Sequence, residues 1–223
     1  MRLNSPKTLH FLLIYVSPSD IYTEQLLICP AISLGFLIEE MNVTISRLPI
    51  YDMEKRHPGL TVGTATSYLE AATVSLNAEH EPPQDFLLNH DEKEHTTEVM
   101  WNPPSNGCLR GWANRDDATR DGAYACAIAA AELSSGLFAM RRAETLTGAD
   151  YYVAPKDTNP DDLESCIRLE VSGTRCDERE VRRRLSNKIQ QVKSGRSSLP
   201  AIAVIVGFKT KQIMMRTVDN DLD

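Results

Sequence analysis

The chain of 223 residues contains few cysteines, and their spacing excludes the common cysteine-based sites. There are five of them, an odd number, and no two form a CxxC pair. None of the five histidines falls at zinc-ligand spacing with them. A disulfide framework or a zinc ribbon is therefore not expected, whereas free thiols in a reducing cytoplasm fit the pattern. The cysteines are Cys29, Cys108, Cys126, Cys166 and Cys176.

The sequence also lacks a hydrophobic run long enough to cross a membrane. Its most apolar stretch, residues 21–40, is interrupted by Glu24, Pro30 and the pair Glu39–Glu40. The uninterrupted apolar part is too short for a bilayer. The first residues resemble a signal peptide only weakly, because their apolar run is short and no convincing small-residue cleavage site follows. We expect a cytoplasmic protein without membrane contact.

Positive charge is outnumbered by negative charge, with 24 Lys and Arg residues against 31 Asp and Glu residues. The formal net charge is −7, and the isoelectric point is near 5.3. This excludes a general nucleic-acid coat protein, which would be basic overall, but not an enzyme that touches DNA through a local basic patch. Hydrophobic residues make up 42% and charged residues 25% of the chain, as in folded globular proteins.

Several catalytic signatures are missing. The sequence has no Walker phosphate loop, no GxGxxG after a strand and no GxSxG nucleophile elbow. The segment 90–95 is dense in potential metal ligands, with His90 and His95 at its ends and acidic residues between them. Its spacing suits no standard zinc helix, so a charged loop or turn is the expected structure.

The chain divides into four regions that differ in composition and in the periodicity of their apolar residues. Residues 1–40 mix apolar runs with Pro and Ser without a clear period and are expected to form a peripheral extension. Residues 41–111 predict a small α+β region, and residues 112–218 predict a larger α/β core. The acidic tail, residues 219–223, is expected to be mobile.

Periodicity predicts the elements of both folded regions. Residues 166–171 alternate apolar and polar side chains, as in a strand, and residues 177–193 carry an apolar stripe at helical spacing. Residues 201–208 form a nearly continuous apolar run, which is typical of a buried central strand. The other expected elements are strands at 41–48, 85–88, 97–101, 137–143, 150–153 and 212–217, and helices at 64–76 and 120–133. We expect an α/β fold with a mixed central sheet flanked by helices.

The order helix, three strands, helix, strand resembles the core of the PD-(D/E)xK nuclease superfamily, the restriction-endonuclease-like fold, over residues about 116–210. In that superfamily an Asp begins one strand of a hairpin, and an acidic-x-Lys triplet lies on the next strand. Asp150 in the segment GADYY matches the first position, and Glu170 in RLEVSG matches the second. A further Glu often comes from the preceding helix; Glu132 fits that position, with Asp121 as the alternative.

The resemblance implies a magnesium-dependent endonuclease that hydrolyses DNA phosphodiesters. Such hydrolysis needs a hard cation to offset phosphate charge and to activate water. Magnesium prefers oxygen ligands, and Asp150 and Glu170 on neighbouring strands would supply them. Glu170 alternates with Leu169 and Val171, so a carboxylate buried on that face needs a partner, and a metal is one such partner.

The sequence departs from the superfamily at Ser172, which stands where the triplet lysine belongs. Either an amine is supplied from elsewhere, with Lys188 on the following helix as the best candidate, or the domain has lost catalysis and kept the fold. Gln190 and Gln191 on the same helix could also approach the site. An inactive protein of this fold would act as a protein-interaction or assembly subunit, and a homo-oligomer is compatible with it. A small-molecule enzyme with an unrecognised site is a third class.

Plainer interpretations apply to each candidate residue. Asp150 after a glycine suits a turn, and Glu170 suits a structural ion pair. Glu132 suits a solvated helix position. The arginine run 182–184 is more often an exposed helix face than a DNA contact, although guanidinium groups bind phosphate well.

Overall fold

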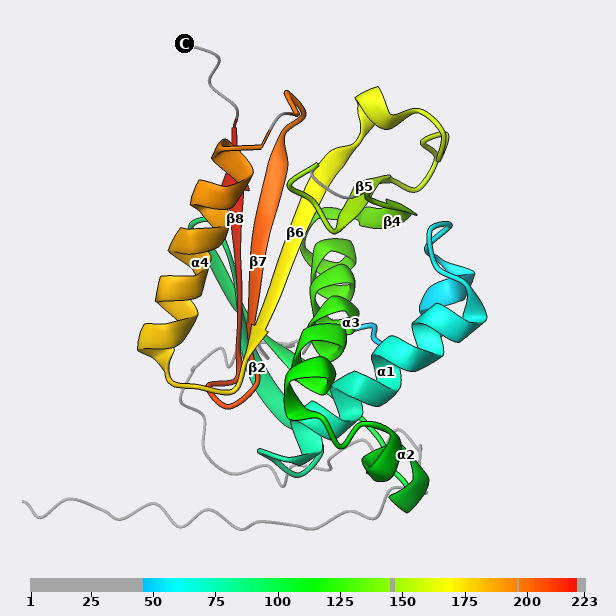
Figure 1. Cartoon of the computed structure of the whole chain (residues 1–223), viewed down its shortest axis with the longest axis vertical. Coiled ribbons are helices and arrows are strands. Elements are labelled where there is room, and N and C mark those ends of the chain that lie inside the picture. Colours follow the sequence, from blue (N-terminus) through cyan, green and yellow to red (C-terminus); the bar gives the residue numbers. More distant parts are fainter. Residues whose placement is uncertain (1–45, 145–146, 196, 220–223) are drawn as a thin grey trace, which may run out of the picture. The chain divides into compact units, whose positions relative to one another are not determined.

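The computed structural model describes residues 46–144, 147–195 and 197–219 (Figure 1). The expected extension, residues 1–40, lies outside the described residues, as do residues 220–223 of the expected tail. None of the helices within the described ranges is long and apolar enough to span a membrane.

The described residues form eight strands, four α-helices and two short 3₁₀ turns. The strands are β1 (Ser46–Arg47), β2 (Gln84–His90), β3 (Lys93–Val99), β4 (Leu137–Arg142), β5 (Tyr151–Pro155), β6 (Ile167–Thr174), β7 (Ala201–Gly207) and β8 (Gln212–Val218). The helices are α1 (Val62–Asn77), α2 (Asn106–Gly111), α3 (Arg115–Ser135) and α4 (Glu178–Lys193), with single 3₁₀ turns η1 (Met53–Lys55) and η2 (Leu163–Ser165). The segment 90–95, expected to be a charged loop or turn, holds a tight turn at Asp91 and the beginning of β3.

The strands form one mixed sheet in the order β1-β3-β2-β8-β7-β6-β5-β4. The pairs β1–β3, β2–β8 and β6–β7 are parallel, and the remaining neighbours are antiparallel. The expectation of an α/β fold with a mixed central sheet flanked by helices is confirmed. Strands from residues 41–111 and from residues 112–218 share this sheet through the pairing of β2 with β8.

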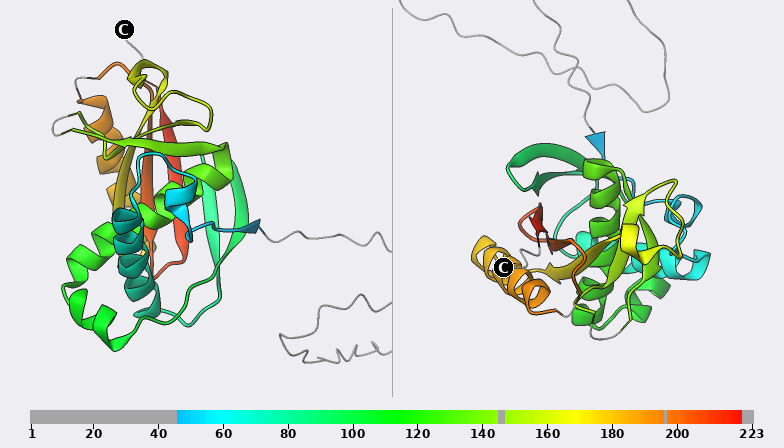
Figure 2. Two further views of the ribbon diagram at one scale, coloured as in Figure 1. Left: turned by 90° about the vertical axis from the view of Figure 1, so that its right-hand side faces the viewer. Right: turned by 90° about the horizontal axis from the view of Figure 1, so that it is seen from above.

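Helices cover both faces of the sheet (Figure 2). On β7, Ile202 and Val204 belong to the large core cluster that includes α1 and α3. Ala203 and Ile205 belong to a second cluster, formed with the apolar stripe of α4. The alternation places α3 and α4 on opposite faces and explains why β7 is buried on both sides, as its continuous apolar run predicts.

Helix α3 begins one turn before the alanine-rich segment. The side chain of Asn114 caps it by accepting hydrogen bonds from the backbone N–H groups of Asp116 and Asp117. The helix ends at Gly136, whose φ of 61° is the left-handed conformation that favours glycine at this position. At Gly122 it packs so closely on α1 that an added Cβ would lie 2.7 Å from the backbone nitrogen of Ala72.

The short strand β5 leaves part of β6 without a neighbour on one side. Within the described residues, β5 pairs with β6 over three positions and ends at the pair Tyr151–Leu169. Strand β6 continues to Thr174 and pairs with β7 along its other side. Residues 170–174 of β6 therefore form an open edge between the layer of α3 and the layer of α4 (Figure 1).

Candidate functional site

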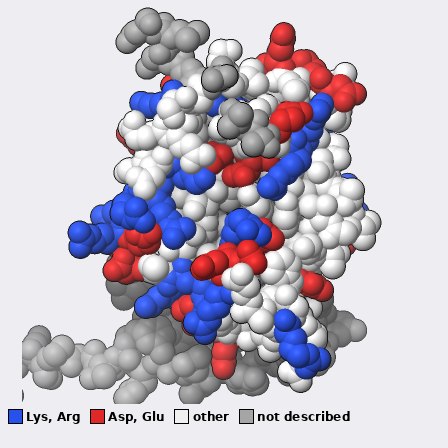
Figure 3. Space-filling view, viewed as in Figure 1, with Lys and Arg blue, Asp and Glu red and all other residues white. Residues whose placement is uncertain are grey.

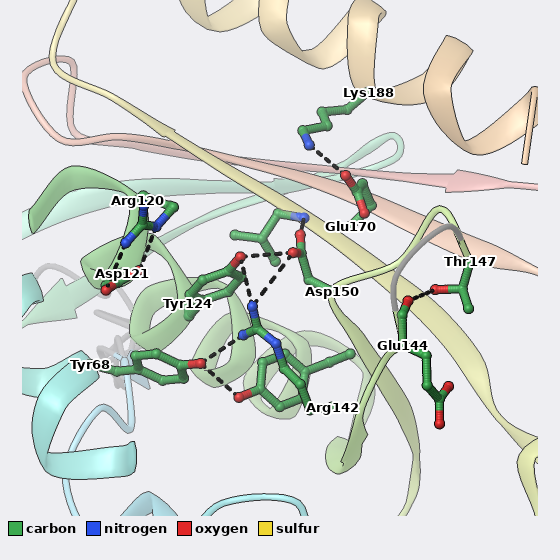
Figure 4. A network of polar contacts seen from close by, with 12 residues as sticks. Tyr68, Arg120, Asp121, Tyr124, Arg142, Glu144, Thr147, Asp150, Glu170 and Lys188 are labelled. Carbon is green, nitrogen blue, oxygen red and sulfur yellow. Dashed lines mark hydrogen bonds and ion pairs between the residues drawn. The ribbon is translucent and has the colours of Figure 1, made fainter. Parts of the chain in front are cut away.

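Glu170 lies on β6 with its side chain toward α4. Its neighbours Leu169 and Val171 point into the opposite, α3-side core, as the sequence alternation predicts. The Glu170 side chain is only 4% exposed. Its Oε1 accepts a hydrogen bond from Lys188 Nζ at 2.5 Å (Figure 4). The same oxygen accepts from Gln191 Nε2 at 2.8 Å, and both donors belong to α4. The buried carboxylate is therefore paired with an ammonium group and an amide.

The surroundings of Glu170 shift its pKa in opposite directions, with a net rise. Burial raises the pKa of its carboxyl group, and repulsion from Asp150 raises it further. The hydrogen bonds and charge from Lys188, and the hydrogen bond from Gln191, lower that pKa and offset part of the shift. Two carboxylates that repel one another in a shared pocket favour the arrival of a cation or a proton.

Asp150 immediately precedes β5 and is fixed at the open edge of β6. Its backbone N–H donates to the carbonyl of Leu169 at 2.8 Å. Its Oδ2 accepts from the backbone N–H of Val171 at 2.8 Å, so the carboxylate takes the place of a strand neighbour. Its Oδ1 accepts from the hydroxyl of Tyr124 on α3 at 2.7 Å. Asp150 is thus bound by two elements, which a simple turn residue does not require.

Arg142 at the end of β4 completes a polar network around Asp150 (Figure 4). Its guanidinium donates to the hydroxyl groups of Tyr68 at 2.7 Å and Tyr124 at 3.2 Å, and Nη2 lies 4.0 Å from Asp150 Oδ1. The same group lies over the rings of Tyr124 and Tyr151, 4.5 and 4.9 Å from their centroids. Burial, followed by the charge and hydrogen bond of Asp150, raises the pKa of Tyr124. Tyr124 is therefore held as a neutral phenol, which donates to Asp150 and accepts from Arg142.

Asp150 and Glu170 line one pocket of about 500 Å³ at the start of the open edge. Two carboxylates suit magnesium, which keeps several waters and often binds substrate phosphates as its other ligands. The described ranges hold no group of three or more His, Cys, Asp or Glu arranged for a metal. Any cation here would take its remaining ligands from water or substrate. The pocket is lined by Arg142, Ala143, Glu144, Gly148, Ala149, Asp150, Glu170 and Gln191.

Glu132 does not join this pocket. It lies near the end of α3, where its carboxylate accepts from Arg56 Nε at 2.7 Å and lies 3.0 Å from His57 Nε2. Tyr124, two turns earlier, is the α3 residue that contacts Asp150. The alternative, Asp121, is paired with Arg120 at 2.8 Å. The structure thus brings together Asp150, Glu170 and Lys188, and leaves Glu132 in a separate ion-pair cluster.

Ser172 follows Glu170 on the same face of β6 and also meets a cation from α4. Its Oγ accepts from Arg184 Nη1 at 3.4 Å, and the carbonyl of Gly173 accepts from the same nitrogen at 2.8 Å. Arg182 and Arg183 are exposed and pair with glutamates of their own helix. The interpretation of the arginine run as an exposed face therefore holds for these two arginines, whereas Arg184 turns toward the sheet.

The sequence reasoning missed Arg142 and its tyrosines, which no motif marks. Comparisons of the chain with protein-family models, with curated proteins and with solved structures find no match.

Proposed function

We propose that this protein is a metal-dependent nuclease-like enzyme that hydrolyses DNA phosphodiesters, with Asp150 and Glu170 as magnesium ligands. One observation carries the proposal: the carboxylates of Asp150, just before β5, and Glu170, on the neighbouring strand β6, line one pocket, and Lys188 donates a hydrogen bond to Glu170. The order α3, β4, β5, β6, α4, β7 supports it, because this is the order that the resemblance to the PD-(D/E)xK superfamily leads us to expect. Because a fold alone does not define an activity, the pocket supports the proposal more strongly than the order of the elements does.

The chemistry asks three things of the pocket. A water oxygen forms a bond to phosphorus and gives up one proton, the bond from phosphorus to the leaving oxygen breaks, and that oxygen takes up a proton. Magnesium held by Asp150 and Glu170 would supply charge to offset the phosphate and to activate the water. Lys188 contributes the positive charge that a lysine at position 172 would contribute. Arg142, oriented by its tyrosines, is placed to bind a phosphate oxygen.

A second candidate is a catalytically inactive protein of the same fold that acts as an interaction or assembly subunit. The specific observation that favours it is that Oε1 of Glu170 already accepts two hydrogen bonds from side chains of α4. A buried structural ion pair would look the same. The two candidates differ in whether magnesium binds to the carboxylates of Asp150 and Glu170.

The decisive experiment is a cleavage assay with the full chain. Labelled single-stranded and double-stranded DNA is incubated with the protein in magnesium, in manganese and in EDTA. Glu170→Gln is compared with Glu178→Gln, which removes a glutamate that is 56% exposed at the start of α4. We expect metal-dependent cleavage that Glu170→Gln abolishes and Glu178→Gln retains. Cleavage that survives Glu170→Gln, or no cleavage of either DNA, would overturn the proposal.

A further inference from the structure

A second pocket, of about 490 Å³, lies along the open edge of β6 next to the acidic pocket. Glu170 lines the first pocket and Ser172, two residues later on the same face, lines the second. Two residues of a strand span about 7 Å. The two pockets therefore lie one after the other along the same edge of β6.

Helix α4 repeats the same step. Lys188 bonds Glu170 at the first pocket, and Arg184, one helical turn earlier, bonds Ser172 at the second. One turn of helix rises about 5.4 Å, which matches the spacing of two strand residues. Glu170 and Ser172 on β6 thus each contact a cationic side chain of α4.

Helix α3 forms the other wall with the same periodicity. Tyr124 contacts Asp150 at the first pocket, and Arg120, one turn earlier, lines the second. Figure 1 shows α3 and α4 on the two sides of β6, where the strand lacks a partner. The pocket with the acidic pair and the second pocket therefore follow one another along β6, the second nearer the start of both helices.

The second pocket is rich in arginine although the whole chain is acidic. Four arginines line it, against Glu79 and Asp116 as its acidic lining residues. The formal net charge of the chain is −7, so this concentration is local. Figure 3 shows Lys and Arg side chains interspersed with acidic groups on the face seen in Figure 1. The four are Arg115, Arg120, Arg175 and Arg184.

Neighbouring carboxylates hold most of these guanidinium groups in place. Arg175 pairs with Glu79, and Arg184 pairs with Glu180. Arg120 pairs with Asp117 through Nη1 and with Asp121 through Nε and Nη2. A guanidinium has five N–H donors in a fixed fork, so an arginine held through one edge can still donate from another. No hydrogen bond or ion pair involves the Arg115 side chain within the described residues, and the Arg184 bonds use Nε and Nη1. The donors that remain suit the oxygens of a phosphate group.

We infer that the second pocket binds a backbone phosphate of the DNA strand whose neighbouring phosphodiester lies at Asp150 and Glu170. The identity of the ligand rests on the proposed function; the position and charge of the pocket do not. The DNA strand runs along the open edge of β6, between α3 and α4. The arginines thereby set the register of the substrate and hold it whether or not a metal is present.

Binding of DNA in EDTA tests this inference apart from catalysis. The affinity of the full chain for a fluorescent single-stranded oligonucleotide and its duplex is measured by anisotropy over a range of salt concentrations. The double variant Arg115→Gln/Arg120→Gln is compared with Arg182→Gln/Arg183→Gln, which removes two exposed arginines outside the pocket. Circular dichroism confirms that both variants fold.

We expect the pocket variant to lose about tenfold in affinity, with a salt slope lower by about 1 to 1.5 for a single strand. The control variant should change less than threefold. Equal losses in the two variants, no binding by the wild type, or binding of inorganic phosphate but not of DNA would overturn the inference. Cleavage by a wild type whose two variants bind alike would refute the second pocket and leave the nuclease proposal standing. Arginine-dependent binding without cleavage would support the pocket and refute the nuclease proposal.

Discussion

Lys188 Nζ lies 2.5 Å from Oε1 of Glu170, although the two residues belong to different elements separated by a loop. Ser172 stands where the resemblance calls for a lysine. The contact with Lys188 places a positive charge beside Glu170 on β6. The ammonium group is 21% exposed, so it stands between the buried carboxylate and solvent. The buried carboxylate of Glu170 therefore has a cationic partner that is itself partly exposed.

The raised pKa of Glu170 makes the stability of the protein depend on pH. The folded carboxyl holds its proton to a higher pH than the unfolded one, so this contribution to the free energy of unfolding is complete below about pH 4.5. It is lost as pH rises through the raised pKa. Glu170→Gln lacks this titration and should become more stable relative to wild type between pH 4 and pH 7. Urea unfolding at both values measures the difference.

Glu178→Gln is the control for that measurement, because its carboxylate is exposed. A gap between wild type and Glu170→Gln that does not widen as pH rises would contradict the assignment. Added magnesium should stabilise the wild type and not Glu170→Gln, because a bound ligand stabilises only the protein that binds it.

Removing Lys188 should be costly only while Glu170 keeps its charge. Lys188→Met at pH 7 leaves the carboxylate with Gln191 as its remaining α4 partner and should lower the free energy of unfolding by about 1–3 kcal/mol. In the Glu170→Gln background the same change should cost much less. A double-mutant cycle measured by urea unfolding gives the coupling, with Lys193→Met at the end of α4 as the control. Additive single effects would show that the pair contributes nothing.

The sequence predicted what depends on local pattern. The orientation of Glu170 followed from its alternation with Leu169 and Val171, and the helix that carries Lys188 followed from its apolar stripe. The contact between Arg142 and Tyr68 joins residues 74 positions apart and depends on how α1 and β4 pack, which periodicity does not specify.

Glu132 is a second case in which the sequence pattern did not specify how the elements pack. It was chosen because the resemblance calls for a carboxylate on the helix, but the phase of α3 puts Tyr124 at Asp150 and Glu132 at His57. The open edge of β6 was equally hidden, because it arises from the short pairing of β5. Features that depend on strand register and helix phase could be identified only from the three-dimensional structure.

The approach of α3 to α1 predicts a substitution that contradicts helix propensity. Alanine stabilises most helix interiors relative to glycine. At Gly122, however, a methyl group would lie 2.7 Å from the backbone of Ala72, which cannot move without shifting α1. Gly122→Ala should lower the free energy of unfolding by about 1–3 kcal/mol. Gly111→Ala, where a methyl group would meet nothing within 4 Å, should be neutral or stabilising. Chemical denaturation of both variants checks this, and a stabilising Gly122→Ala would mean that the helices lie farther apart.

His57 should make stability fall in mild acid. It is fully buried; its Nδ1 accepts from the backbone N–H of Ala139 at 3.0 Å, and its Nε2 lies 3.0 Å from Glu132. Burial lowers the pKa of the imidazole, and Glu132 offsets only part of that shift. The unfolded histidine therefore takes up a proton at a higher pH than the folded one. Its contribution to stability is complete above about pH 6.5 and is lost as pH falls through the lowered pKa.

The substitution His57→Leu separates this contribution from other titrations. At pH 7.5 it should cost about 2–3 kcal/mol, because it removes both hydrogen-bond partners and leaves Glu132 and the Ala139 N–H to find others. At pH 5.5 the gap to wild type should be smaller, because the wild type has lost the histidine contribution there. Urea unfolding at the two pH values measures the gap, with the exposed His95→Gln as control. A gap that is unchanged or larger at pH 5.5 would show that the pKa of His57 is not lowered.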